Sequence, residues 1–201
     1  MHVHIDADLH AMLAQIRERQ QDVVRVGRRI GGGGSGGGGL TPSEVFLDPA
    51  VPSSISRSID APFSFLIEFT TGADVTTTQF VFTANDGTAN NRFLVYVSGG
   101  NVRVQVRQGG ANRADFVAGA VTGNTTHKVA IRTDTNNHGA SLDGATVVTA
   151  TGVVWAAGVL NDSYLFGANT VGEASFTGTI ARVAEYETKA LDDATLISLS
   201  S

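Results

Sequence analysis

FLVYVSGGNVRVQV, residues 93–106, is the stretch of the sequence that decides the fold. Apolar residues fill its first half and alternate with polar residues in its second half, as in strands that bury one face. The Gly-Gly pair between the halves suits the positive φ angles of a tight hairpin turn. The stretch therefore predicts a β-hairpin with strands over 93–97 and 102–106.

Similar short apolar runs recur through most of the chain. Turn sequences separate them, notably NDG at 85–87 and DG at 143–144. The further strands expected are 63–69, 79–82, 129–131, 140–142, 164–166 and the long run 176–186, with the connection before 140–142 passing through 136–139. Among residues 40–201, only 191–199 reads as helical, with Asp192 and Asp193 favouring its first turn. Many short strands at this spacing predict an all-β sandwich or jelly roll.

Composition divides the 201 residues into three segments: a helical segment over 1–30, a glycine-rich linker over 31–39, and a β-sandwich over 40–201. The chain has no cysteine, so the sandwich must be stabilised by its core without disulfides. No segment approaches the roughly 20 apolar residues of a membrane-spanning helix, so no membrane span is expected. The N-terminus also lacks a signal-peptide pattern, which favours delivery by lysis or as part of a particle.

The first segment follows a heptad-like pattern in which five of seven seam positions are apolar. A lone helix of this length is barely stable in water, so the segment is interpreted as a partner-binding element. Three alternatives remain open: docking in a groove of a partner protein, self-association in a small bundle with a trimer favoured, and disorder in isolation. The seam positions are Leu9, Leu13, Ile16, Gln20, Val23, Gly27 and Ile30.

The linker reads GGGGSGGGG and has no side chain to bury, which predicts a flexible spacer between the two flanking segments. It is similar to a laboratory linker, and a natural glycine-rich hinge fits equally well.

Several motifs in the third segment resemble one known group of proteins. HKVAIR at 127–132 followed by SLDG at 141–144 resembles a strand pair that ends in a tight DG turn. YLFGA at 164–168, FTGTI at 176–180 and VAEY at 183–186 resemble a closing strand pattern. Both patterns are similar to those of the laminin-G-like domains of the concanavalin A-like lectin and glucanase superfamily.

This resemblance implies a two-sheet jelly-roll sandwich with a short terminal helix against the sandwich edge. The pattern of the last long strand agrees with this fold, since Phe176, Ile180 and either Val183 or Tyr186 are expected to fill the core.

Catalysis is not expected from the sequence. Retaining glycanases of this fold carry an E-x-D-x-x-E strand motif, which is absent here. Glu185 and Glu187 share a strand face but lack a third acid, and they are interpreted as exposed acids on an outer strand. The third segment has two histidines, His127 and His138, without a Ser-His-acid arrangement.

Asn- and Asp-rich loops are the candidate ligand sites. Their oxygens suit calcium or sugar hydroxyls. The same residues are also common in turns, because Asn and Asp side chains hydrogen-bond the nearby backbone. No cofactor is assigned, and calcium stays open. Trp155 is interpreted as a core residue, with a sugar-stacking platform as the alternative. The candidate loop residues are Asp86, Asn90, Asn91, Asp134, Asn136, Asn137, Asn161 and Asp162.

His2 and His4 would share one face of an extended strand. Three copies around a threefold axis would offer six imidazoles, an octahedral site for iron or nickel. The alternative is two ordinary polar residues near a terminus.

An anchoring helix, a hinge and a cysteine-free sandwich resemble the decoration or fibre proteins of tailed bacteriophages. The leading hypothesis is a virion appendage that docks on other virion proteins through residues 1–30 and adheres to host-surface polysaccharide through the sandwich. A ligand-free spacer or cap and, less favoured, a glycan hydrolase are the alternatives. Nucleic-acid binding is not expected, because residues 40–201 hold nine basic against fifteen acidic residues without a basic stripe in the sequence.

Overall fold

The computed structural model describes residues 40–47, 54–56, 58–151, 160–168 and 176–201. The chain separates into two units at Leu40, and the described residues from Thr41 onward form the second unit. Several expectations lie outside the described residues: the helix with its seam positions over 1–30, the linker, the His2 and His4 pair, and Trp155.

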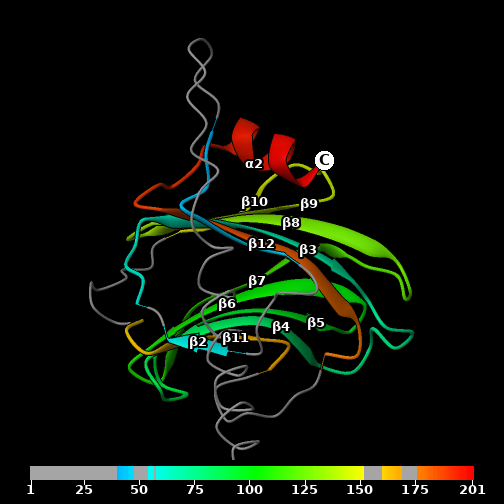
Figure 1. The fold of residues 1–201 in the computed structure, drawn as a ribbon, viewed down its shortest axis with the longest axis horizontal. Coiled ribbons are helices and arrows are strands. Elements are labelled where there is room, and N and C mark those ends of the chain that lie inside the picture. Colours follow the sequence, from blue (N-terminus) through cyan, green and yellow to red (C-terminus); the bar gives the residue numbers. More distant parts are fainter. Residues whose placement is uncertain (1–39, 48–53, 57, 152–159, 169–175) are drawn as a thin grey trace, which may run out of the picture. The chain divides into compact units, whose positions relative to one another are not determined.

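Twelve strands among the described residues form two antiparallel six-stranded sheets (Figure 1). Sheet A has the order β1 (Glu44–Leu47), β12 (Thr179–Glu187), β3 (Phe63–Thr70), β8 (Thr126–Thr133), β9 (Asn137–Leu142), β10 (Val148–Thr151). Sheet B has the order β2 (Ser54–Ser56), β11 (Ser163–Phe166), β4 (Gln79–Asn85), β5 (Arg92–Ser98), β6 (Asn101–Gln108), β7 (Ala111–Ala120). The predicted two-sheet jelly-roll sandwich is confirmed.

Phenylalanine rings fill the space between the sheets. Phe63 and Phe65 of sheet A lie with ring centroids 5.4 and 6.1 Å from Phe93 of sheet B. Phe65 also lies 4.9 Å from Phe82 and 5.8 Å from Tyr164. All five rings are fully buried, so the aromatic pairs connect the two sheets and stabilise the sandwich beyond the burial of their area.

The predicted hairpin over 93–106 is present as β5 and β6. Its turn residues Gly99 and Gly100 have φ angles of 58° and 74°, which glycine adopts without strain. Asp143 and Gly144 likewise turn with φ angles of 49° and 72° after β9. Strand β9 begins at Asn137, so the connection before it is shorter than predicted. The Asn137 carbonyl accepts a 3.0 Å hydrogen bond from the amide of Asp134.

Strand β12 corrects the interpretation of Glu185. Val183 and Glu185 share the face that points between the sheets, and Glu185 is 0% exposed. The Tyr164 hydroxyl donates a 3.2 Å hydrogen bond to it across the core. Glu187, as expected, is exposed. The prediction of two exposed acids was wrong for Glu185, because β12 is covered by sheet B on that face.

The terminal helix α2 (Asp193–Ser200) forms where it was expected, with the Asp192 carboxylate accepting a 2.7 Å hydrogen bond from the Thr195 amide. It lies over the outer face of sheet A above β8 and β9, however, and not against the sandwich edge (Figure 1). Leu196 of the helix packs with a second apolar cluster that includes Tyr186. The outer face of sheet A is therefore apolar enough to need a cover.

Candidate functional site

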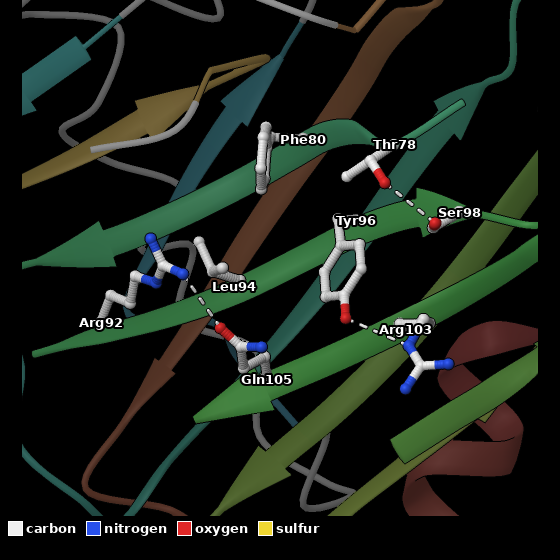
Figure 2. Close-up of a pocket in the computed structure, with 8 residues that line it drawn as sticks. All are labelled: Thr78, Phe80, Arg92, Leu94, Tyr96, Ser98, Arg103 and Gln105. Atoms are coloured by element: carbon white, nitrogen blue, oxygen red, sulfur yellow. Dashed lines mark hydrogen bonds between the residues drawn. The ribbon is translucent and has the colours of Figure 1, made fainter. Parts of the chain in front are cut away.

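The outer face of sheet B carries an open depression of about 380 Å³ (Figure 2). Alternation along β5 and β6 creates it: the valines at 95, 97, 102, 104 and 106 point into the core, and the intervening residues point outward. No helix of the described chain covers this face, in contrast with sheet A. The lining residues are Thr78, Phe80, Arg92, Leu94, Tyr96, Ser98, Arg103 and Gln105.

Asp115 of β7 anchors one end of the depression. Its Oδ1 accepts a 2.7 Å hydrogen bond from Arg103 Nη2 and a 3.3 Å hydrogen bond from the Tyr96 hydroxyl. Its Oδ2 accepts a 3.1 Å hydrogen bond from Gln105 Nε2. The hydrogen bond to Asp115, followed by that to Tyr96, raises the pKa of the Arg103 guanidinium. One carboxylate therefore neutralises Arg103 and orients three side chains.

Arg92 lines the other end of the depression, and Arg107, which lies beside the depression and does not line it, is the direct partner of Arg92 across β5 and β6. Arg92 Nη2 donates a 3.2 Å hydrogen bond to Gln105 Oε1, and Arg107 donates through Nε and Nη2 to the Gly110 carbonyl. Neither guanidinium pairs with a carboxylate within the described part of the chain. Burial, followed by repulsion from Arg107, lowers the pKa of Arg92. This end of the depression is cationic.

Aromatic rings lie beside the polar groups at the Asp115 end. The Phe80 and Tyr96 ring centroids are 6.1 Å apart on neighbouring strands. Figure 2 shows the Tyr96 hydroxyl directed toward Arg103; Tyr96 is 9% exposed and Phe80 is partly buried. Burial raises the pKa of Tyr96. Thr78 and Ser98 share a 3.0 Å hydrogen bond beside these rings. Rings next to hydroxyl, amide and guanidinium groups can stack on a sugar and hydrogen-bond its hydroxyls.

One of the predicted ligand loops flanks the cationic end. Asp86, Asn90 and Asn91 lie between β4 and β5, and they bond mainly to the protein itself. Burial alone would raise the pKa of Asp86, but the hydrogen bonds that it accepts from Asn91 and Thr88 together lower it. Asn91 Oδ1 accepts from the Gly109 amide, and the Asn90 carbonyl accepts from the Gly110 amide. The loop thus ties the β4–β5 and β6–β7 connections together beside Arg92.

The other predicted loops divide between the sheets. Asn161 and Asp162 precede β11 at the same end of sheet B, where the Asp162 amide donates to the Asn85 carbonyl. Asn136 and Asn137 belong to the β8–β9 hairpin of sheet A, together with Asp134. The structure therefore does not bring the three loops together into one site.

The two histidines of the sandwich lie in sheet A and away from the depression. His127 Nδ1 lies 2.7 Å from Asp143 Oδ2, and His138 is fully buried with no hydrogen bond to either ring nitrogen in the described residues. Among the described residues, no group of three or more His, Cys, Asp or Glu side chains could hold a metal ion. No helix in this part of the chain is long and apolar enough to cross a membrane.

Reasoning from the sequence missed the depression entirely. Its residues lie in strands, whereas the predicted ligand residues lie in loops. The available signal was the outward position of Arg92, Tyr96, Arg103 and Gln105, which alternate with buried valines in the hairpin already predicted. The absence of a basic stripe in the sequence was also misleading, because antiparallel pairing brings Arg92 and Arg107 together.

Comparison with solved structures places the fold among jelly-roll sandwiches of carbohydrate-active proteins. The CBM40 module of the Ruminococcus gnavus IT-sialidase, bound to α2,3-sialyllactose, superposes with a TM-score of 0.59 at 18% identity. The match covers 75% of this chain and 97% of that module. Neither a protein-family model nor a curated protein sequence matches the chain.

Two further structures share the fold. Domain 4 of AbnA, a GH43 extracellular arabinanase from Geobacillus stearothermophilus, was solved with arabinotriose and has a TM-score of 0.57 at 16% identity, covering 87% of this chain and 86% of that one. The NanB sialidase from Streptococcus pneumoniae has a TM-score of 0.62 at 16% identity, covering 79% of this chain and 28% of that one. At these identities the likeness defines the fold class, a jelly-roll sandwich of the kind found in carbohydrate-binding modules.

Proposed function

We propose that this protein is a non-catalytic glycan-binding module whose binding face is the outer side of β4, β5 and β6. The observation that carries the proposal is the depression itself, in which two aromatic rings lie beside guanidinium and amide groups. Sugars present apolar ring faces and a surrounding set of hydroxyls, so a face of this composition is chemically complementary to them.

Preorganisation of the face supports the same function. Gln105, Arg103 and Tyr96 are held by Asp115 before any ligand arrives, so little side-chain entropy is lost on binding. A shallow site gains most from this effect, because it buries only part of its ligand.

The solved neighbours add support of a different kind. The Ruminococcus gnavus module was solved with sialyllactose and the arabinanase domain with arabinotriose, so sandwiches of similar fold in both proteins bind oligosaccharides. The neighbours also include sialidase chains, of which this chain matches only about a quarter to a third. We therefore propose binding, without hydrolysis, for this chain.

A glycan array probed with the full chain tests the proposal. We expect a subset of glycans to bind, and Tyr96→Ala to lower their affinity about tenfold or more through loss of stacking and of one hydroxyl. Lys189→Ala is the matched control, because Lys189 is exposed and lies outside the depression. Uniform absence of binding would favour a spacer or cap without ligand, and release of reducing sugar would favour a hydrolase.

We further propose that residues 1–30 fasten the protein to a larger particle, such as a virion, so that the sandwich is displayed on its surface. The heptad-like seam from Leu9 to Ile30 supports this role. Deleting residues 1–30 should abolish incorporation into the particle and leave a folded sandwich. If the truncated chain is still incorporated, the anchoring role is excluded.

A further inference from the structure

The charges of the sandwich are distributed very unevenly between its strands. Residues 40–201 hold nine basic and fifteen acidic side chains, yet β5, β6 and β7 together hold four arginines and one acid. The arginines are Arg92, Arg103, Arg107 and Arg113, and the acid is Asp115. Three adjacent strands with a net positive charge in an otherwise acidic protein attract anionic ligands to that place.

The single acid leaves most of this positive charge unbalanced. Asp115 pairs with Arg103 at 2.7 Å, and Arg92 and Arg107 have no carboxylate partner in the described residues. The Nε of Arg92 is moreover buried without a hydrogen bond there. Two facing guanidinium groups repel each other, so an anion that lies between or above them would relieve a cost that the protein bears in its free state.

Neighbouring acids do not balance these arginines. Asp86 and Asp162 belong to loops at the same end of sheet B, where their carboxylates accept hydrogen bonds from Thr88, Asn91 and Ser163. Neither acid forms an ion pair with Arg92 or Arg107 in the described part of the chain. The two cations therefore stay available to a ligand.

We infer that the preferred ligand is a carboxylated glycan, with its acidic sugar at the Arg92 and Arg107 end and its uncharged sugars extending toward Tyr96. The inference rests on the proposed glycan-binding function and adds the ligand's class and orientation. Arginine forks match a carboxylate through paired hydrogen bonds, whereas the Asp115 end is already neutral and suits hydroxyl groups. Arg92 and Tyr96 lie four residues apart on β5, about 13 Å, which requires more than one sugar ring.

Two pairs of probes test the inference by titration calorimetry on the full chain. The first pair is sialyllactose and lactose, and the second is an oligogalacturonate and its carboxyl-reduced, neutral counterpart. We expect an acidic member to bind at least about tenfold more tightly than its neutral partner, as hydrogen bonds to a charged group predict. The two pairs distinguish a terminal sialic acid from an internal uronic acid as the source of the carboxylate.

Variants at Arg92 test whether the carboxylate of the glycan binds at this residue. Arg92→Gln should remove about tenfold to a hundredfold of the affinity for the acidic probe and lower the affinity for its neutral partner by a much smaller factor. Arg92→Lys keeps the charge without the fork and should recover part of the loss. Lys189→Ala should bind as the unmodified chain does, and thermal unfolding of each variant verifies that it is folded.

The possible failures separate the two claims. Equal binding of acidic and neutral probes would overturn the carboxylate inference and leave glycan binding intact. Acidic preference that persists in folded Arg92→Gln would also overturn it, by locating the carboxylate elsewhere. Absence of binding to these four probes and to every glycan of the array would overturn the proposed function itself.

Discussion

Asp115 holds three side chains of the depression in place and is the acid that balances Arg103. We expect Asp115→Asn to lower glycan affinity roughly tenfold, because the neutral amide holds Arg103 less firmly and Gln105 loses a charged acceptor. The free energy of unfolding should fall by less than about 1 kcal/mol, because the pair is partly exposed to solvent. Calorimetric titration and urea unfolding measure the two quantities.

Asp134→Asn is the matched control for this change, because Asp134 is an acid of the β8–β9 hairpin in the other sheet. It should leave glycan affinity unchanged. An Asp115→Asn variant with full affinity would show that the hydrogen bonds of Asp115 do not organise the binding face.

His138 predicts a specific response to acid. Its side chain is fully buried, and burial lowers its pKa to about 4 from an ordinary 6.5. The unfolded chain therefore binds a proton in a pH range where the folded protein does not, so stability falls as pH decreases from about 6.5 toward 4. The loss amounts to about 2 kcal/mol between pH 7 and 4.5.

Urea unfolding at pH 7 and 4.5 measures this response, with His138→Gln as the comparison. The variant should lose stability overall but show a difference between the two pH values that is smaller by about 2 kcal/mol. Carboxylates with lowered pKa, such as Asp86 and Asp192, affect stability mainly below this range. An unchanged difference in the variant would assign the acid sensitivity to other groups.

The elements of the fold were predictable to different degrees. Apolar runs bounded by turn residues predict the hairpin β5–β6 and strand β3. Strand β7, by contrast, reads ANRADFVAGA, in which small and charged residues hide the alternation of Ala114, Phe116 and Ala118 toward the core. Edge strands such as β7 commonly carry charged side chains, which discourage pairing with another chain.

Pairing between distant elements was the part that local patterns could not supply. Strand β12 lies between β1 and β3, and β11 lies between β2 and β4. In the pairs β1–β12 and β2–β11, the paired residues are more than a hundred positions apart in the sequence. Local propensity contains no information about such partners. The candidate site depended on the same information, since Asp115 reaches Arg103 and Gln105 only through the register of β6 with β7.

Helix α2 stabilises the sandwich through the outer face of sheet A. Leu196 is fully buried against Leu66, Ala130 and Tyr186. We expect Leu196→Ala to lower the free energy of unfolding by about 2–4 kcal/mol, through lost burial and the cavity that remains. Ile197→Ala, one position along and only partly buried, should cost less. Urea unfolding gives both values, and similar losses for the two variants would contradict the assigned packing.

The outer faces of the two sheets differ in character. The outer face of sheet A is apolar and covered by α2, whereas the corresponding face of sheet B is polar, positively charged and not covered by any helix of the described residues. Stability and recognition can therefore be altered independently. Leu196→Ala should leave glycan affinity unchanged as long as the protein is folded.

The division of the chain at Leu40 leads to a prediction about avidity. If the first segment assembles several copies, as in the self-association alternative, each copy adds a shallow site to the same assembly. Deleting residues 1–39 should then leave affinity for a soluble oligosaccharide and the unfolding midpoint of the sandwich unchanged. Binding to a glycan-coated surface should fall by a factor on the order of a hundred, because effective concentration no longer assists the second contact. Surface plasmon resonance beside calorimetry measures the two affinities, and an equal surface affinity for both chains would show that the first segment does not assemble the sandwich.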